Sequence, residues 1–233
     1  MALPKLNAPI YNLVIPSTGK EINYRPYLVR EEKLLLIAME SEDIKQIETA
    51  LLNIIQACVD DTEVNKLTRF DVEYIFSKLR SKSVGETSEL MVKCEECQAE
   101  NKVLINIDGV LVTDKPDTKI ELADSTGIIM KFPNMKDYKD IENLETESSV
   151  EALFNVVVSS IESIYQGEDL FPADAHTKKE LHDFVDSLNT TQFKLIQNFI
   201  EKSPQAYINV KFQCEACNHN HDNDLKGMAN FFG

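Results

Sequence analysis

The spacing of apolar residues along the chain changes several times, and each change marks a different predicted element. Apolar and polar residues alternate over 10–27 around a glycine-containing turn at 17–20, which predicts a β-hairpin. From Val29 the spacing becomes helical. We expect three helices that share one core, over residues 30–39, 41–59 and 69–81.

Shorter, strand-like runs begin after residue 85. Two strands of one hairpin are predicted over 89–93 and 102–107, and a small antiparallel element over 119–122 and 127–132 extends it. Helical spacing then returns around a loop at 165–174, and a last strand candidate covers 206–213. The expected helices of this region are 134–141, 147–164, 177–188 and 191–202.

This pattern predicts an α+β fold that is mostly helical. Residues 1–85 form the hairpin and three-helix domain, and 86–133 the first half of a cysteine-containing β element. Residues 134–204 form a helical insertion. Residues 205–233 complete the β element and end in a short tail.

Two matching cysteine pairs, which we call the knuckles, carry the clearest candidate chemistry. Each is a C-x-x-C sequence that follows a strand-like run: Cys94 with Cys97, and Cys214 with Cys217. Two such turns can supply the four sulfurs that tetrahedral Zn²⁺ prefers. Because all four positions are then filled by protein, we expect one structural zinc in a zinc-ribbon-like element. The two knuckles can share it only if the chain between them begins and ends at one place.

Other roles for these residues remain open on the sequence alone. A single C-x-x-C is also typical of a thioredoxin-like redox pair. His219 and His221 follow the second knuckle and could replace a sulfur, although four cysteines are already available. The fifth cysteine, Cys58, lies in an amphipathic helical stretch, where we expect a buried, unreactive side chain.

Composition and charge narrow the class of partner. The chain has 233 residues, 43% of them hydrophobic, and carries 24 basic against 39 acidic residues for a net charge of −15. Such a charge opposes binding to nucleic acid, so proteins are the expected partners. No apolar run is long enough to span a membrane, and no secretory signal is present, so we expect a cytosolic protein.

Aromatic residues near both ends are the candidate partner-binding residues. Tyr11, Tyr24 and Tyr27 belong to the predicted hairpin, which could add to a partner's sheet or pack on its own domain. Phe231 and Phe232 in the tail could likewise dock on a partner or on the parent domain. No phosphate-binding loop, nucleophile motif or histidine metal pair is found, which argues against an enzyme.

Together with the knuckles, the N-terminal sequence resembles a known family. The segments that carry this resemblance are LPKLNAPIY at 3–11, IPSTGK at 15–20 and YRPYLVREEK at 24–33. They are similar to baseplate hub subunits or hub assembly proteins of T-even-like contractile-tailed bacteriophages. The resemblance implies no enzymatic activity, other hub and tail proteins as partners, and a place in the host cytoplasm during assembly or in the virion tail baseplate. Only the four knuckle cysteines carry over as functional residues.

Three hypotheses follow. The first is a structural or assembly protein of a phage baseplate hub in which zinc clamps the fold. The second is a zinc-ribbon adaptor of transcription or replication machinery, which the acidic residues around both knuckles disfavour. The third is a thiol–disulfide enzyme. It is disfavoured because acidic residues inside a knuckle raise the pKa of its thiols.

Overall fold

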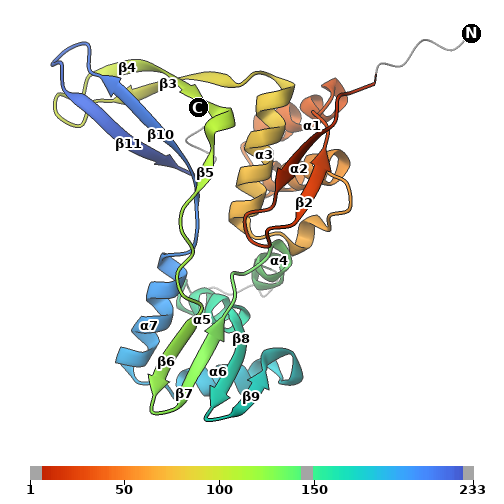
Figure 1. Ribbon diagram of the computed structural model, residues 1–233, viewed down its shortest axis with the longest axis vertical. Helices are drawn as coiled ribbons and strands as arrows, with labels where there is room; N and C mark the ends of the chain where they lie inside the picture. The colour runs from red at the N-terminus through yellow and green to blue at the C-terminus, as the bar shows by residue number, and fades with distance from the viewer. Residues whose placement is uncertain (1–6, 143–148, 228–233) are drawn as a thin grey trace, which may run out of the picture. The chain divides into compact units, whose positions relative to one another are not determined.

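A computed structural model describes residues 7–142 and 149–227 (Figure 1). Contacts within the chain divide it into two compact units. Met1–Thr113 and Gln205–Gly233 make up the first, which we call the discontinuous unit, and Asp114–Pro204 make up the second, the inserted unit. Within the described residues, no helix is long and apolar enough to cross a membrane.

The discontinuous unit begins with the predicted hairpin, which the structure confirms. Strand β1 (Tyr11–Val14) pairs antiparallel with β2 (Glu21–Tyr24), and Leu13 lies opposite Ile22. Both of these side chains are buried, as alternation along a half-buried strand requires. Gly19 supplies the positive φ angle, 72°, that the connecting turn needs.

The three expected helices also form, at bounds close to those predicted: α1 (Val29–Glu40), α2 (Ile44–Cys58) and α3 (Arg69–Ser83). Asp43 caps α2 by accepting hydrogen bonds from the backbone of Lys45 and Gln46. Thr68 and Asp71 form a capping box at the start of α3. Fully buried side chains of α2 and α3 contribute to the core: Ile54, Ile55, Ile75 and Leu79.

Two further hairpins in this unit contain the cysteines. The first joins β3 (Thr87–Lys93) to β4 (Glu100–Asn106), and the second joins β10 (Ala206–Gln213) to β11 (Asn220–Lys226). A short strand, β5 (Leu111–Val112), pairs with the start of β10. Inward-facing residues of both hairpins and the linking segment share one core: Leu90, Val103, Ile105, Ile107, Val110, Ala206, Ile208 and Val210.

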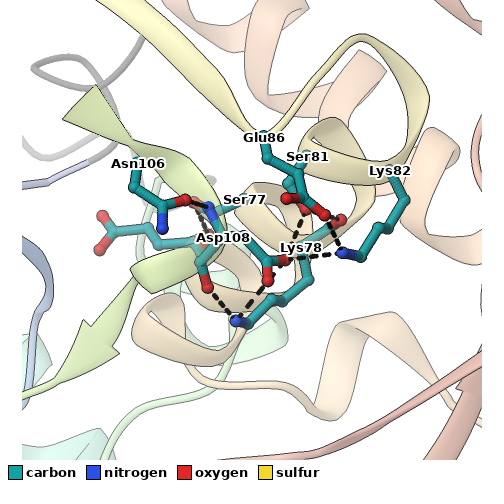
Figure 2. A network of polar contacts seen from close by, with 8 residues as sticks. Ser77, Lys78, Ser81, Lys82, Glu86, Asn106 and Asp108 are labelled. Atoms are coloured by element: carbon teal, nitrogen blue, oxygen red, sulfur yellow. Dashed lines mark hydrogen bonds and ion pairs between the residues drawn. The ribbon is translucent and has the colours of Figure 1, made fainter. Parts of the chain in front are cut away.

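A polar network attaches helix α3 to the turn that follows β4 (Figure 2). The Asp108 carboxylate accepts a hydrogen bond from the Ser81 hydroxyl at 2.8 Å and lies 3.4 Å from the Lys82 ammonium group. Lys82 also pairs with Glu86 at 2.6 Å, and Lys78 donates to the Asp108 backbone carbonyl. The network therefore holds the first cysteine hairpin against the helical part of the same unit.

The inserted unit is a four-stranded antiparallel sheet with helices on one face (Figure 1). The strand order is β6-β7-β8-β9, and one core joins Ile128 and Met130 of β7 to side chains of α5, α6 and α7. The elements are β6 (Lys119–Ala123), β7 (Thr126–Met130), α4 (Met135–Glu142), α5 (Ser149–Ser159), β8 (Ile161–Gln166), β9 (Asp169–Pro172), α6 (Lys178–Asp186) and α7 (Thr190–Glu201).

The predicted helix over 147–164 is wrong at its end, because α5 stops at Ser159 and strand β8 begins at Ile161. The hydroxyl groups of Ser159 and Ser160 both donate to the Val156 carbonyl, at 2.9 and 2.7 Å, and so compete with continuation of the helix. The segment from Ile161 then pairs with strands on both sides. The predicted loop at 165–174 likewise contains β9, reached through a tight turn at Gly167, whose φ angle is 62°.

These two strands change the fold class only in detail. The structure is 41% helical and 29% strand, so the α+β class is confirmed, whereas the prediction of a mostly helical fold is not. Strands β6 and β7 were expected to extend the cysteine element, but they pair with β8 and with each other. The compact inserted unit therefore starts at residue 114 and not at 134.

We expect the Asp108→Asn variant to be less stable than the parent protein by about 1–2 kcal/mol at pH 7, because the amide cannot balance Lys78 and Lys82. Burial by itself raises the pKa of Asp108, but the Ser81 hydroxyl and both ammonium groups outweigh burial and hold it below its usual value. A depressed carboxyl pKa contributes stability above about pH 4, which is lost as the pH falls through the folded value.

Urea unfolding of both proteins from pH 7 to pH 3 tests this expectation. The difference in unfolding free energy should shrink as the pH falls. Asp186→Asn, at an exposed position in the inserted unit, is the control and should show neither effect. A difference that stays constant with pH would show that the Asp108 charge is not what stabilises the network.

Candidate metal centre

The first knuckle is a tight turn that connects β3 to β4. The Cys94 backbone N–H donates to the Ala99 carbonyl at 2.9 Å, and the Gln98 N–H donates to the Cys94 carbonyl at 2.9 Å. Gln98 adopts a positive φ of 61°, which lets the chain reverse immediately after the second cysteine. Both Cys94 and Cys97 therefore lie on one short loop.

The second knuckle, between β10 and β11, repeats the same turn. The Cys214 N–H donates to the His219 carbonyl at 2.8 Å, and the Asn218 N–H donates to the Cys214 carbonyl at 2.9 Å. Asn218 has a φ of 60°. The two hairpins are thus local copies of one another that come from distant parts of the sequence.

The four cysteine sulfurs form one cluster. Sγ of Cys94 lies 3.6 Å from Sγ of Cys217, and Sγ of Cys97 lies 3.6 Å from Sγ of Cys214. All four lie within 4.8 Å of one another. These separations exceed the roughly 2.05 Å of a disulfide. A tetrahedral zinc with Zn–S bonds of about 2.3 Å has S···S edges of about 3.8 Å, so the cluster has the size that such an ion requires.

The distant halves meet because the inserted unit leaves and re-enters the discontinuous unit at one place. Val112 in β5 pairs with Ala206 in β10. Beyond this pair, the Thr113 N–H donates to the Gln205 carbonyl at 3.1 Å, and the Gln205 N–H donates to the Thr113 hydroxyl at 3.0 Å. The expectation that the intervening chain begins and ends together is therefore confirmed.

Backbone donors favour the thiolate form of at least one sulfur. N–H groups of Cys217 and Ala216 point at Sγ of Cys214 and lower the pKa of that thiol to about 6. In the same knuckle the His219 N–H lowers the pKa of the Cys217 thiol, but burial and the neighbouring sulfurs outweigh it and raise that pKa to about 12. A thiolate is the form that binds a metal ion.

Each hairpin also sends one buried polar side chain into the other knuckle. Asn101 of the first hairpin accepts a hydrogen bond from the Glu215 backbone N–H at 3.0 Å. His221 of the second hairpin places Nε2 3.3 Å from Sγ of Cys94. The two residues occupy equivalent positions after their own knuckles, and both are buried. The two contacts therefore connect the hairpins, one reaching from the first to the second and the other from the second to the first.

Neither histidine of the second hairpin belongs to the sulfur cluster itself. His221 contacts one sulfur and stacks on Phe212, with ring centroids 4.4 Å apart. His219 lies edge-on to His221 and is exposed. Sequence reasoning considered both histidines only as replacement ligands and did not identify Asn101. Aligning the two knuckles on their first cysteines would have found the matched pair.

Cys58 lies outside the cluster, as expected. Its side chain is buried in α2, and burial raises the pKa of the thiol to about 11. A thiol with such a pKa stays protonated at neutral pH and reacts slowly. Cys58 is therefore a suitable internal reference for the other four cysteines.

The predicted partner-binding tyrosines divide into two groups. Tyr24 and Tyr27 are only 3% and 7% exposed, and Tyr27 stacks on Phe76 of α3, so both belong to the core of their own unit. Because their side chains are buried, they are not accessible to a partner protein. Tyr11 remains partly accessible. Phe231 and Phe232 lie outside the described residues, and their role stays a prediction.

Lysines beside the knuckles pair with neighbouring carboxylates. Lys102 lies 2.6 Å from Glu89 across the first hairpin, and Lys211 lies 2.8 Å from Asp222 across the second. These pairs neutralise positive charge on a unit that is already acidic. A face that binds phosphates needs the opposite, a surplus of basic side chains.

Comparison with known proteins identifies the protein family to which the chain belongs. The chain matches the family described as T4 bacteriophage base plate protein over residues 8–233, and it belongs to that family. The resemblance seen in the sequence is thereby confirmed. One relative is the baseplate hub assembly protein gp26 of Enterobacteria phage T4, which is 25% identical over 223 residues, covering 95% of this chain and 97% of the relative. No solved structure matches the chain.

We expect Asn101→Ala to destabilise the discontinuous unit by about 1–3 kcal/mol, because the variant loses a partly buried hydrogen bond from the Glu215 N–H and the packing of a buried side chain. Asn209→Ala is the matched control. Asn209 bonds to Asp222 and Asp224 on the exposed face of the second hairpin, and its loss should cost less than about 0.5 kcal/mol. Urea unfolding measures both variants, and equal losses would contradict a special role for Asn101.

Proposed function

We propose that this protein is a non-enzymatic structural or assembly protein of a bacteriophage tail baseplate hub and acts through contacts with other baseplate proteins. Membership of the baseplate family supports this proposal, as does the relative whose name describes hub assembly. The relative is matched almost from end to end, so the likeness is not confined to one domain.

We further propose that Cys94, Cys97, Cys214 and Cys217 hold one structural Zn²⁺ in a zinc ribbon. The observation that carries this step is the cluster of four sulfurs that lie within 4.8 Å of one another, close to the size of a tetrahedral Zn–S₄ site. Thiolates are soft ligands that suit zinc, and four of them leave no position for a substrate or water. The ion would supply cross-links between two hairpins that are otherwise joined only by their shared core and a few hydrogen bonds.

The other two hypotheses are less well supported. A thioredoxin-type pair places its reactive cysteine at the start of a helix, whereas each knuckle here leads directly into a strand. The 3.6 Å contacts also join different knuckles. A nucleic-acid adaptor needs a basic face, whereas Lys102 and Lys211 beside the knuckles are paired with carboxylates and the net charge of the chain is −15.

Metal analysis of the purified protein tests the zinc site. We expect one zinc per chain by elemental mass spectrometry, with four thiols becoming reactive when a chelator removes it. Cys97→Ser should lose the metal and unfold at much lower temperature, because a structural zinc contributes roughly 10 kcal/mol or more of apparent binding free energy in small zinc domains.

Cys58→Ala is the matched control and should keep both the metal and most of the stability, since it removes a cysteine outside the cluster. Metal-free protein that melts like the parent would refute the zinc site. Rapid reaction of the knuckle thiols in protein as purified would instead favour redox chemistry.

The assembly role requires a test that does not depend on zinc. We expect co-expression with baseplate hub proteins of the same phage to yield a complex that elutes as one peak in size-exclusion chromatography. The protein alone and an unrelated zinc-ribbon protein serve as controls. If the chain elutes separately from every hub protein tested, the proposed assembly role loses its support.

A further inference from the structure

Helix α1 is held in place mainly by its first turn and one small residue. The Glu31 carboxylate is buried, where it accepts a hydrogen bond from the Leu28 N–H at 2.7 Å and pairs with Arg25 at 3.1 Å. Arg25 in turn donates to the Ala57 carbonyl at the end of α2, at 2.9 Å. Near the other end of the helix, Ala38 is buried. These contacts, together with the half-buried Leu35, fix the helix and leave its other large apolar side chains outside.

Those large side chains lie on the outside of the unit. Leu34, Leu36 and Ile37 are 57, 55 and 53% exposed. We call these three, with the exposed neighbours Val29, Met39 and Ile44, the α1 surface. A helix with apolar residues on most sides is normally buried, and grouped exposed apolar residues mark an interaction site. Within the described part of the chain, nothing covers them to the extent that a core requires.

Charges around this surface indicate the kind of occupant. Three carboxylates border it, at Glu32, Glu40 and Glu42, against the exposed ammonium group of Lys33. Arg30 is engaged by Glu31 at 2.6 Å. The whole chain carries a net charge of −15. A second copy would therefore bring like charge to the same place, which opposes self-association. A partner with basic side chains around an apolar stripe would be attracted.

The kind of backbone contact also restricts the occupant. An extended segment that adds to a sheet needs a strand edge with free backbone groups. A helix satisfies its backbone internally and offers only side chains, which pack best in the grooves of another helix. The α1 surface thus favours a helical partner segment.

We propose that the α1 surface binds an amphipathic helix of another baseplate protein, one whose apolar stripe is bordered by lysine or arginine. This inference rests on the assembly role proposed above and names the surface and the partner chemistry. It assigns binding to a region away from the cysteine hairpins, so the metal centre and the partner contact are separate sites.

Site-directed photo-cross-linking in cells that produce phage tails tests the inference. A photoreactive residue at position 36 should cross-link to a helical, lysine- or arginine-bordered segment of another protein, identified by peptide sequencing. The control is the same residue at position 104, which is 65% exposed on the outer face of β4. We expect at least a tenfold lower yield of that product from position 104.

Cross-links from position 36 to a second copy of this chain, to an acidic segment or to a strand would overturn the inference, as would equal yields at the two positions. The double variant Leu36→Ser/Ile37→Ser, with Leu104→Ser as its control, tests the α1 surface separately from the assembly role. If tails assemble with the parent protein and fail without it, yet assemble normally with the double variant, the assembly role stands and the α1 surface does not.

Discussion

The discontinuous unit depends on one constraint, the return of the chain at Gln205 to the place that it left at Thr113. Two hydrogen bonds between these residues and the pairing of Val112 with Ala206 enforce that return. Isolated two-stranded hairpins are marginally stable, so the two cysteine hairpins need their shared core. The inserted unit has its own sheet and core, so it can hold its two ends together without contributing to the cysteine cluster.

The cysteine element is built from two copies of one local design. Each copy has the same two turn hydrogen bonds, a left-handed residue at the same position and one buried polar side chain that reaches across. The copies differ in that last residue: Asn101 satisfies a backbone N–H, whereas His221 contacts a sulfur. The cluster is therefore surrounded unequally, with a ring system packed beside Cys94 and a backbone contact beside Cys214. A single amide and a single imidazole thus connect halves that lie far apart in sequence.

The stabilising polar network and the proposed partner-binding surface lie on different parts of the discontinuous unit. The polar network around Asp108 joins α3 to the first cysteine hairpin, while α1 keeps its apolar side chains outside. Such separation suits an assembly protein, because a folding cross-link can stay constant while a docking surface adapts to its partner. The acidic charge of the chain discourages self-association and favours basic partners.

The sequence alone determined the features whose causes lie within a few residues. The hairpin at Gly19, the start of α3 at Arg69 and both knuckles depend on local turn and cap chemistry, and all were predicted. Tertiary structure decided what depends on distant neighbours. The segment after Ser160 became a strand because β7 and β9 pair with it. Tyr24 and Tyr27 became core residues because other parts of their unit bury them, with Phe76 of α3 stacked on Tyr27. The contacts of Asn101 and His221 likewise exist because two hairpins distant in sequence meet. A local sequence pattern does not show which residues of one hairpin will contact the other.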